Sequence, residues 1–145
     1  MDVLSVPAGA AVRAMDVPSL SIVVPVYNED AVLPEFHRRL AAVLDLLPAV
    51  AEVIYVNDGS QDGSLSLLHR LRNADVRVAV LDLSRNFGKE IAMTAGLDHA
   101  RGDAVVVIDA DLQDPPELIP QLVAKWREGF DMVYARRVRR DGETA

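Results

Sequence analysis

The sequence predicts a three-layer α/β domain with a mostly parallel sheet. Short runs rich in β-branched residues alternate with longer segments whose apolar residues recur every three or four positions. This alternation is typical of strands joined by crossover helices that cover the faces of a parallel sheet. No internal repeat interrupts it. The expected strands lie at residues 20–26, 53–56, 76–83, 103–108 and 132–135.

Four helices are expected between these strands, at residues 33–47, 63–72, 90–100 and 115–128. Pro34 is tolerated only near the start of the first helix, and Pro48 ends it. For the fourth helix we expect Asp114 as N-cap, Pro115 at the first helical position and Glu117 as the acid of a capping box. Helix initiation therefore explains these two acids adequately.

Composition limits the classes of function. The chain has 145 residues, half of them hydrophobic, which predicts one domain with a sizeable core. It has no cysteine, so disulfides, thiol catalysis and cysteine metal sites are excluded. A formal charge of −7 argues against nucleic-acid binding, because phosphate contacts need a basic surface. No apolar run reaches the roughly 18 residues that a membrane span needs.

The domain is expected at residues 19–140, between two terminal segments. Residues 1–18 are rich in small residues and aperiodic, and they lack the basic and apolar regions of a signal peptide. We therefore expect a flexible leader there. Residues 141–145 are expected to be a polar tail.

The most informative stretch is the fourth expected strand, where Val105–Ile108 run directly into Asp109 and Asp111. Four β-branched residues in a row predict a strand buried on both faces. Acids at the end of such a strand are costly to desolvate without a partner. If the backbone turns there, as the following Gln-Asp-Pro-Pro indicates, both carboxylates can face one hard divalent cation.

Two further acids follow strands, Glu29 after the first and Asp58 after the second. Locally, Glu29 is better explained as an acid in the first turn of a helix, where the dipole favours it. For Asp58, a turn aspartate before Gly59 and a functional residue are equally good explanations. Parallel strand ends share one edge of the sheet, so these acids could converge with Asp109 and Asp111 on one crevice.

Common nucleotide and hydrolase motifs are missing. No Gly-x-Gly-x-x-Gly follows the first strand, and Gly88-Lys89 lacks the other residues of a P-loop. There is no Gly-x-Ser-x-Gly nucleophile elbow. The histidines His37, His69 and His99 share no ligand spacing, so we expect them to be surface or half-buried helix residues.

Four ordered segments, at residues 21–29, 56–64, 84–90 and 108–117, closely resemble the inverting family-2 glycosyltransferases. Within that family they look like the branch of dolichyl-phosphate mannose synthases and bactoprenol glucosyltransferases. The similarity covers residues 20–140. It implies a Rossmann-like GT-A fold that binds a nucleotide-diphosphate sugar.

The resemblance also implies roles for residues. Asp109 and Asp111 match the family's Asp-x-Asp, which holds Mg²⁺ or Mn²⁺ against the donor diphosphate. The implied substrate-binding residues are Pro25, Tyr27 and Glu29 around the base and ribose, Asp58 at the base, Arg85 and Lys89 near the nucleotide, Gln113 in the metal and phosphate shell, and Arg136 or Arg137 at the diphosphate. The arginines from 136 to 140 could equally be a solvated end or lean on an anionic membrane surface.

The implied reaction is metal-dependent transfer of a hexose, with inversion, to a polyprenyl phosphate. Relatives continue past this length with an acceptor-binding half, so the chain is expected to be a truncated, donor-binding portion, or to meet a partner chain that supplies the rest. No catalytic base is assigned. We expect a cytoplasmic location, peripheral at the inner face of the membrane. The base, the sugar, the acceptor and the oligomeric state stay open.

Three other functions share parts of this pattern. A non-catalytic fragment that binds a nucleotide sugar needs the same residues and differs only in turnover. A phosphatase of the haloacid dehalogenase type also uses Asp-x-Asp, but places it after the first strand with Thr or Val where Gln113 stands. A receiver-type signalling domain shares the alternating pattern, but it needs a lysine after its fifth strand, where this chain has arginines.

Overall fold

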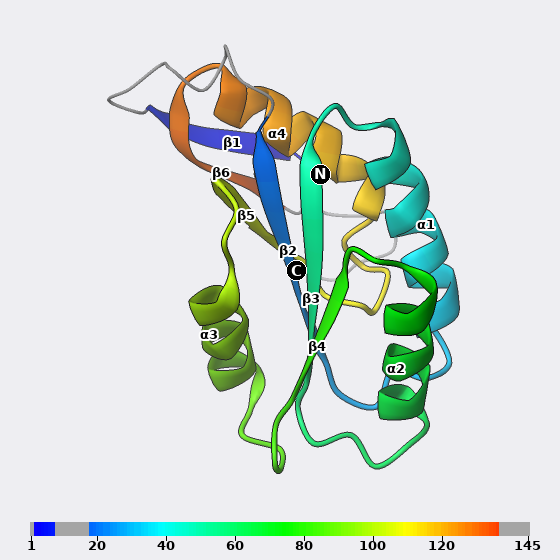
Figure 1. Cartoon of the computed structure of the whole chain (residues 1–145). Helices are drawn as coiled ribbons and strands as arrows, with labels where there is room; N and C mark the ends of the chain where they lie inside the picture. The colour runs from blue at the N-terminus through cyan, green and yellow to red at the C-terminus, as the bar shows by residue number, and fades with distance from the viewer. Residues whose placement is uncertain (1, 8–17, 137–145) are drawn as a thin grey trace, which may run out of the picture. The chain divides into compact units, whose positions relative to one another are not determined.

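The computed structural model of the chain describes residues 2–7 and 18–136, with side chains described from residue 18 to 129. The strands are β1 (Asp2–Pro7), β2 (Ser19–Val26), β3 (Val50–Asn57), β4 (Val78–Asp82), β5 (Ala104–Val107) and β6 (Phe130–Arg136). The helices are α1 (Leu33–Leu46), α2 (Ser64–Ala74), α3 (Lys89–His99) and α4 (Ile119–Arg127), with a 3₁₀ turn at Pro116–Leu118 (Figure 1). The chain divides into two compact units, Val17–Glu117 and Met1–Asp16 with Leu118–Ala145.

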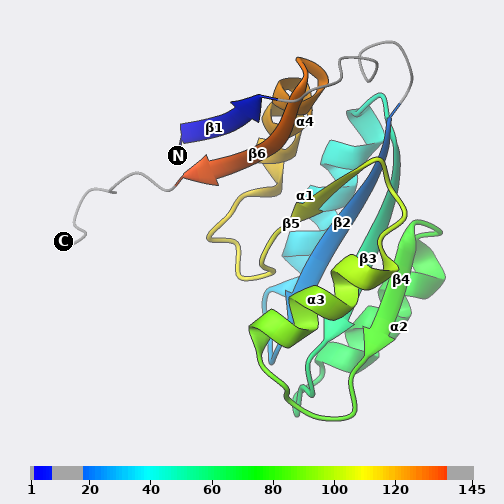
Figure 2. The same cartoon turned by 90° about the vertical axis from the view of Figure 1, so that its left-hand side faces the viewer.

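The unit of residues 17–117 is built on a four-stranded sheet in the order β4-β3-β2-β5. All neighbouring strands in it are parallel. Helices α1 and α2 cover one face, and α3 covers the other (Figures 1 and 2). These are three layers around a parallel sheet, so the predicted fold class is confirmed.

Successive residues of the central strands point to opposite layers, as the pleat requires. Tyr55 of β3 is fully buried toward α1, where its ring meets Phe36 edge-on at 6.4 Å between centroids. On the other face, Val23 and Val56 lie under α3. The helix approaches closely because it has Gly96 there: an added Cβ would lie 2.3 Å from Val23 Cγ1. Burying each of these large side chains contributes about 1.5–3 kcal/mol.

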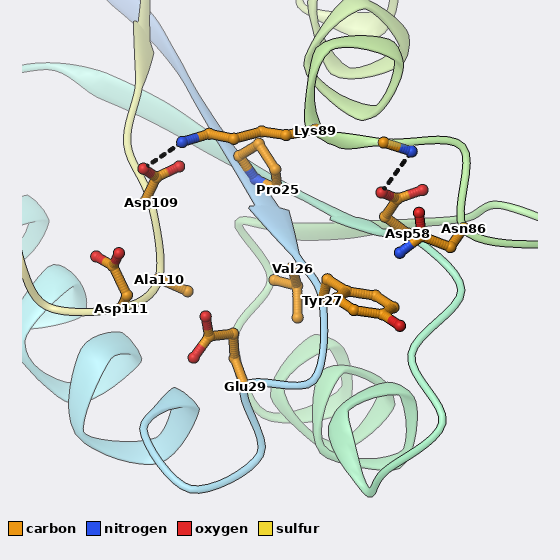
Figure 3. A pocket seen from close by; sticks show the side chains of 11 residues that line it. Pro25, Val26, Tyr27, Glu29, Asp58, Asn86, Lys89, Asp109, Ala110 and Asp111 are labelled. Atoms are coloured by element: carbon orange, nitrogen blue, oxygen red, sulfur yellow. Dashed lines mark hydrogen bonds and ion pairs between the residues drawn. The ribbon is translucent and has the colours of Figure 1, made fainter.

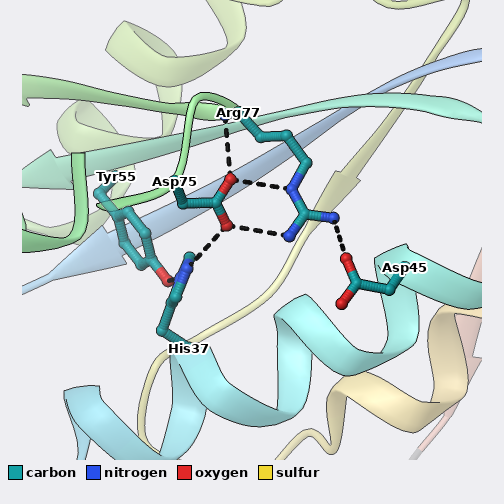
Figure 4. A network of polar contacts seen from close by, with 5 residues as sticks. All are labelled: His37, Asp45, Tyr55, Asp75 and Arg77. Carbon is teal, nitrogen blue, oxygen red and sulfur yellow. Dashed lines mark hydrogen bonds and ion pairs between the residues drawn. The ribbon is translucent and has the colours of Figure 1, made fainter. Parts of the chain in front are cut away.

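A polar network in this unit joins α1 to the sheet (Figure 4). His37 Nδ1 lies 2.6 Å from the Tyr55 hydroxyl, and His37 Nε2 lies 3.1 Å from Asp75 Oδ2. Arg77 donates to both oxygens of Asp75 and to Asp45 on α1. The expectation that His37 is a surface or half-buried residue is therefore wrong: it is buried, and its ring nitrogens have polar partners.

Strand β5 differs from its prediction. Val105 and Val107 are 41% and 40% exposed, so this strand is not buried on both faces. Within the part of the chain that the structure describes, β5 is an edge strand that pairs with β2 on one side only, and Val105 and Val107 project from the same face of it. Sequence periodicity cannot distinguish an apolar edge strand from a central one.

The second unit contains β1, α4 and β6. The strand predicted at residues 132–135 is present as β6, but it pairs antiparallel with β1 and not with the parallel sheet. Within the flexible leader predicted at residues 1–18, Asp2–Pro7 form β1. Residues 8–17 and the predicted tail at 141–145 lie outside the described residues.

The fourth helix begins later than predicted. Its first residue is Ile119, its N-cap is Leu118, and no side chain caps it. Asp114 is therefore not its N-cap. The cause is the proline pair, because a residue before proline avoids the helical region, and this keeps Pro115 out of a helix. Glu117 forms an ion pair with Arg39 of α1 where a capping box was predicted.

Within the described residues, no helix combines the length and the apolar character that a membrane crossing demands.

Candidate functional site

A pocket of about 320 Å³ opens where β2, β3 and β5 end and α3 begins (Figure 3). All of its lining residues belong to the unit of residues 17–117. They are Pro25, Val26, Tyr27, Glu29, Asp58, Asn86, Gly88, Lys89, Asp109, Ala110 and Asp111. The predicted convergence of strand-end acids on one crevice is thus confirmed. In an open α/β sheet, this edge is where ligands bind.

The loop that carries Glu29 is held by the turn after β3 and by the first residue of α2. The backbone N–H groups of Asn28 and Glu29 donate to Ser60 Oγ at 3.0 Å and Ser64 Oγ at 2.9 Å. Because α1 begins only at Leu33, Glu29 lies before the helix. The explanation of Glu29 as a first-turn helix acid is therefore wrong, and its carboxylate faces the pocket (Figure 3).

Three of the lining acids, Glu29, Asp109 and Asp111, face this space together. Burial raises the pKa of Glu29, and the negative charges of Asp111 and Asp109 raise it further. A raised pKa here means that the pocket disfavours another negative charge. Lys89, the first residue of α3, partly offsets that charge, because its Nζ lies 2.6 Å from Asp109 Oδ2.

The backbone turn that the Asp-x-Asp pair needs is present after β5. Leu112 adopts a positive φ of 64°. Asp111 Oδ1 accepts the backbone N–H of Gln113 at 3.0 Å, which closes the turn. Asp109 and Asp111 consequently both line the pocket.

The donor set fits a hard cation that is shared with a ligand. No group of three or more potential metal-ligating side chains occurs within the described residues, so a cage made of protein alone is not formed there. Mg²⁺ usually binds in another way, through one or two carboxylates plus water and substrate phosphates. Asp109 and Asp111, beside an open pocket, match that pattern.

Asp58 is buried, with 3% of its surface exposed. Its Oδ1 accepts the backbone N–H of Phe87 at 2.8 Å, and its Oδ2 accepts that of Gly88 at 3.1 Å. The carboxylate therefore connects the end of β3 to the loop that leads into α3.

The structure brings seven of the predicted site residues into the pocket, namely Pro25, Tyr27, Glu29, Asp58, Lys89, Asp109 and Asp111. Arg85 and Gln113 are not among the lining residues; the guanidinium of Arg85 lies over the Phe87 ring, 4.6 Å from its centroid. The side chain of Arg136, at the end of β6, and all of Arg137 lie outside the described residues. Which of these residues bind a ligand stays a prediction.

Sequence reasoning missed four lining residues, Val26, Asn86, Gly88 and Ala110. Each is a direct neighbour of a residue that was predicted. The signal that could have found them is this adjacency, since a pocket at strand ends is lined by consecutive loop residues as well as by isolated side chains.

Comparisons with known proteins agree with this geometry. The family model described as "Glycosyl transferase family 2" matches residues 21–145. The chain is 55% identical over 124 residues to the uncharacterized glycosyltransferase YkcC of Bacillus subtilis, covering 86% of this chain and 38% of that protein. It is 49% identical over 118 residues to the bactoprenol glucosyl transferase of Shigella phage SfV, covering 81% of this chain and 38% of the relative.

A solved structure is also similar. The mannosyltransferase PcManGT from Pyrobaculum calidifontis, in complex with GDP-Man and Mn²⁺, aligns with a TM-score of 0.66 and 26% identity, covering 87% of this chain and 35% of that one. The chain thus spans less than half the length of the relatives that it matches. The family-model match over residues 21–145 excludes the haloacid dehalogenase and receiver alternatives. By the same match, the chain belongs to glycosyl transferase family 2.

Proposed function

We propose that the chain is the donor-binding part of a metal-dependent, inverting glycosyltransferase that moves a hexose from a nucleotide-diphosphate sugar to a polyprenyl phosphate. The observation that carries the proposal is the pocket in which Glu29, Asp109 and Asp111 meet beside Lys89. The named function of the phage relative supports a prenyl acceptor. The GDP-Man and Mn²⁺ bound to the mannosyltransferase support the donor and the cation.

In this proposal Asp109 and Asp111 hold Mg²⁺ or Mn²⁺. The cation, when bound, offsets the negative charge that grows on the departing diphosphate. Pro25 and Tyr27 form the wall against which the nucleoside packs, and Tyr27 is 45% exposed and so accessible to a ligand. The ammonium of Lys89 adds positive charge beside the phosphates.

Residues outside the pocket lining enter the proposal through the resemblance alone. Gln113 would contribute to the shell of metal and phosphate oxygens, and Arg85 would lie near the nucleotide. Arg136 or Arg137 would place a guanidinium on the diphosphate, where its planar fork can bind two oxygens at once.

The acceptor chemistry explains why no catalytic base is needed among the described residues. Inversion requires the acceptor to attack the anomeric carbon from the face opposite the diphosphate. A lipid phosphate is already anionic, so it needs no proton removed before it attacks. The reaction would take place at the inner face of the membrane, with the protein peripheral to the lipid that carries the acceptor.

The test is to measure thermal unfolding of the protein with added nucleotide sugars, in the presence and in the absence of Mn²⁺. At a hundredfold excess over the dissociation constant, a ligand of the native state adds about 2.7 kcal/mol of stability. We expect this gain only with the cation, and we expect Asp109→Ala and Asp111→Ala to abolish it. Asp98→Asn is the control, because Asp98 is exposed near the far end of α3 and does not line the pocket. If no UDP- or GDP-sugar stabilises the protein with Mn²⁺, the proposal fails.

A second candidate is donor binding without rapid transfer by these 145 residues alone. The observation in its favour is that they correspond to 38% of the length of the curated relatives. Single-turnover transfer from a labelled nucleotide sugar to a short-chain polyprenyl phosphate tests it. Fast transfer by this chain alone would contradict it.

A further inference from the structure

We infer that Asn28 and Ser64 are positioning residues that hold Glu29 at the pocket before any ligand arrives. They belong to an inter-loop network, which consists of hydrogen bonds between residues 28–30, after β2, and residues 60–64, before and at the start of α2. Neither Asn28 nor Ser64 is among the described lining residues, so both would act through Glu29 and not by touching a ligand. The inference deepens the proposed function and rests on it for the identity of the ligand.

The network is reciprocal, since each loop accepts hydrogen bonds from the backbone of the other. Three consecutive backbone N–H groups of the first loop donate to side-chain oxygens of the second: Asn28 to Ser60 Oγ at 3.0 Å, Glu29 to Ser64 Oγ at 2.9 Å and Asp30 to Asp62 Oδ2 at 3.2 Å. Two N–H groups of the second loop donate in return: Gln61 to Asn28 Oδ1 at 2.8 Å and Gly63 to Asp30 Oδ2 at 3.0 Å. The backbone on both sides of Glu29 is therefore tied to the second loop.

Asn28 fixes the chain immediately before Glu29. Its φ of 53° lies in the left-handed region, which residues other than glycine rarely adopt and in which asparagine and aspartate are enriched. Its side chain also bonds to the second loop, because Oδ1 accepts the N–H of Gln61. Asn28 thus combines an uncommon backbone turn with an acceptor, and both determine the direction in which the chain reaches Glu29. Asn28 is itself exposed, so changing it does not disturb the core.

Ser64 holds the N–H of Glu29 itself. The residue is fully buried, so water cannot readily replace its hydroxyl as the acceptor. Its own backbone N–H donates to Asp62 Oδ1 at 2.9 Å. Burial raises the pKa of Asp62, but hydrogen bonds from Ser64 and Asp30 outweigh this, so the pKa is lowered and the carboxylate stays an ionised acceptor. Removing the Ser64 hydroxyl would leave the N–H of Glu29 without its partner.

Glu29 needs such support because of the groups that its carboxylate faces. In Figure 3 it points toward the same space as Asp109 and Asp111, and like charges repel. On an untied loop the carboxylate would turn away from these two acids. A loop that is already ordered keeps the carboxylate in place and reduces the entropy cost of binding. The network thereby favours binding without making a ligand contact of its own.

The variants separate the side chain of Asn28 from its backbone conformation. Asn28→Ala removes both the acceptor and the preference for a positive φ, whereas Asn28→Asp keeps both. Asn28→Gly keeps only the freedom to adopt a positive φ. Ser64→Ala removes the hydroxyl that accepts the N–H of Glu29. Ser66→Ala is the matched control, because Ser66 is an exposed residue of the same helix and is not among the described lining residues.

The first measurement is hydrogen exchange without any ligand, expressed as protection factors of the Glu29 and Gln61 amides. We expect the protection of Glu29 to fall about tenfold in Ser64→Ala and in Asn28→Ala, and that of Gln61 to fall as much in Asn28→Ala and Asn28→Gly. Asn28→Asp and Ser66→Ala should keep both values, with the amides of β2 and β3 unchanged throughout. Unchanged protection of Glu29 in either alanine variant would overturn the role of that residue. This measurement needs no nucleotide, so failure of the proposed function is told apart from failure of this inference.

The second measurement is affinity for UDP and GDP with Mn²⁺. We expect Asn28→Ala and Ser64→Ala to weaken both about tenfold, which is about 1.4 kcal/mol, and Asn28→Asp to retain the original affinity. Unchanged affinity in a variant whose Glu29 amide has lost protection would refute positioning. A double-mutant cycle with Glu29→Gln completes the test: if Asn28 acts through Glu29, adding Asn28→Ala to Glu29→Gln changes the affinity little, whereas full additivity contradicts the inference.

Discussion

The ion pair between Lys89 and Asp109 predicts that the lysine competes with a metal ion for the same carboxylate. Lys89 Nζ lies 2.6 Å from Asp109 Oδ2. A cation that binds Asp109 must displace this ammonium, so the energy of the ion pair opposes metal binding. Replacing Lys89 by Gln removes that opposition and keeps a side chain of similar length.

The size of the effect follows from the distance and the exposure. Two unit charges at 2.6 Å attract by about 1.6 kcal/mol in bulk water. The side chains of Lys89 and Asp109 are 63% and 28% exposed. For pairs this open to solvent, the cost of ordering the side chains reduces the net energy to about 0.2–1 kcal/mol. Lys89→Gln is therefore expected to tighten Mn²⁺ binding in the absence of nucleotide by up to about fivefold.

The same variant is expected to have the opposite effect on the nucleotide. Once a cation has taken Asp109, the displaced ammonium is available to phosphate oxygens, so Lys89→Gln should weaken UDP or GDP binding in saturating Mn²⁺. Electron paramagnetic resonance of free Mn²⁺ measures the first effect, and calorimetry measures the second. Lys125→Gln is the control, because Lys125 pairs with Glu128 and does not line the pocket. Mn²⁺ affinity that is unchanged or lower in Lys89→Gln would refute the reasoning.

Two predictions concern the polar network around His37. Tyr55→Phe leaves the buried Nδ1 of His37 without the hydroxyl that lies 2.6 Å away. Urea unfolding should therefore show a free energy of unfolding that is lower by about 1–3 kcal/mol. The control Tyr27→Phe, at the exposed pocket wall, should change it by almost nothing. Burial lowers the pKa of His37 although Asp75 opposes this, so below pH 6.5 the unfolded chain binds a proton that the folded chain resists. Stability should therefore fall as the pH drops from 6.5 toward the lower folded pKa, by at most about 1.4 kcal/mol per unit. His37→Gln should remove this part of the pH dependence, and an identical pH profile would contradict the assignment. The pKa of Asp75, held at about 2 chiefly by hydrogen bonds from Arg77, keeps this carboxylate charged throughout that range.

The fold was predictable where the pattern is local. The alternation of strands and helices follows from hydrophobic spacing, and the element bounds agree closely from β2 to α3. The partner of a strand is not local information. Nothing in residues 130–136 indicates that they pair with residues 2–7, more than 120 positions away, and that β5 is an edge strand depends on the whole sheet.

The candidate site was predictable for the same reason. Its prediction failed where a contact joins residues that are far apart in the sequence. Acids after strand ends predict a shared crevice, because all parallel strands end at one edge. What Asp58 contacts could not be predicted, since its partners Phe87 and Gly88 lie 29 and 30 residues further along the chain. The local pattern Asn-Asp-Gly-Ser indicates only a turn, and it carries no information on which loop will lie against that turn.

The charge of the pocket determines how cation and donor must depend on each other. Its described lining contains Glu29, Asp58, Asp109 and Asp111 against one positive residue, Lys89. The charge of Asp58 is offset by two backbone donors, whereas the pKa of Glu29 is raised first by burial and then by the negative charges of Asp111 and Asp109. A diphosphate would add to this repulsion, so a cation must reduce it before or as the donor binds. If the proposed cation and donor both bind here, their coupling is reciprocal, so the factor by which Mn²⁺ tightens nucleotide binding must equal the factor by which the nucleotide tightens Mn²⁺ binding.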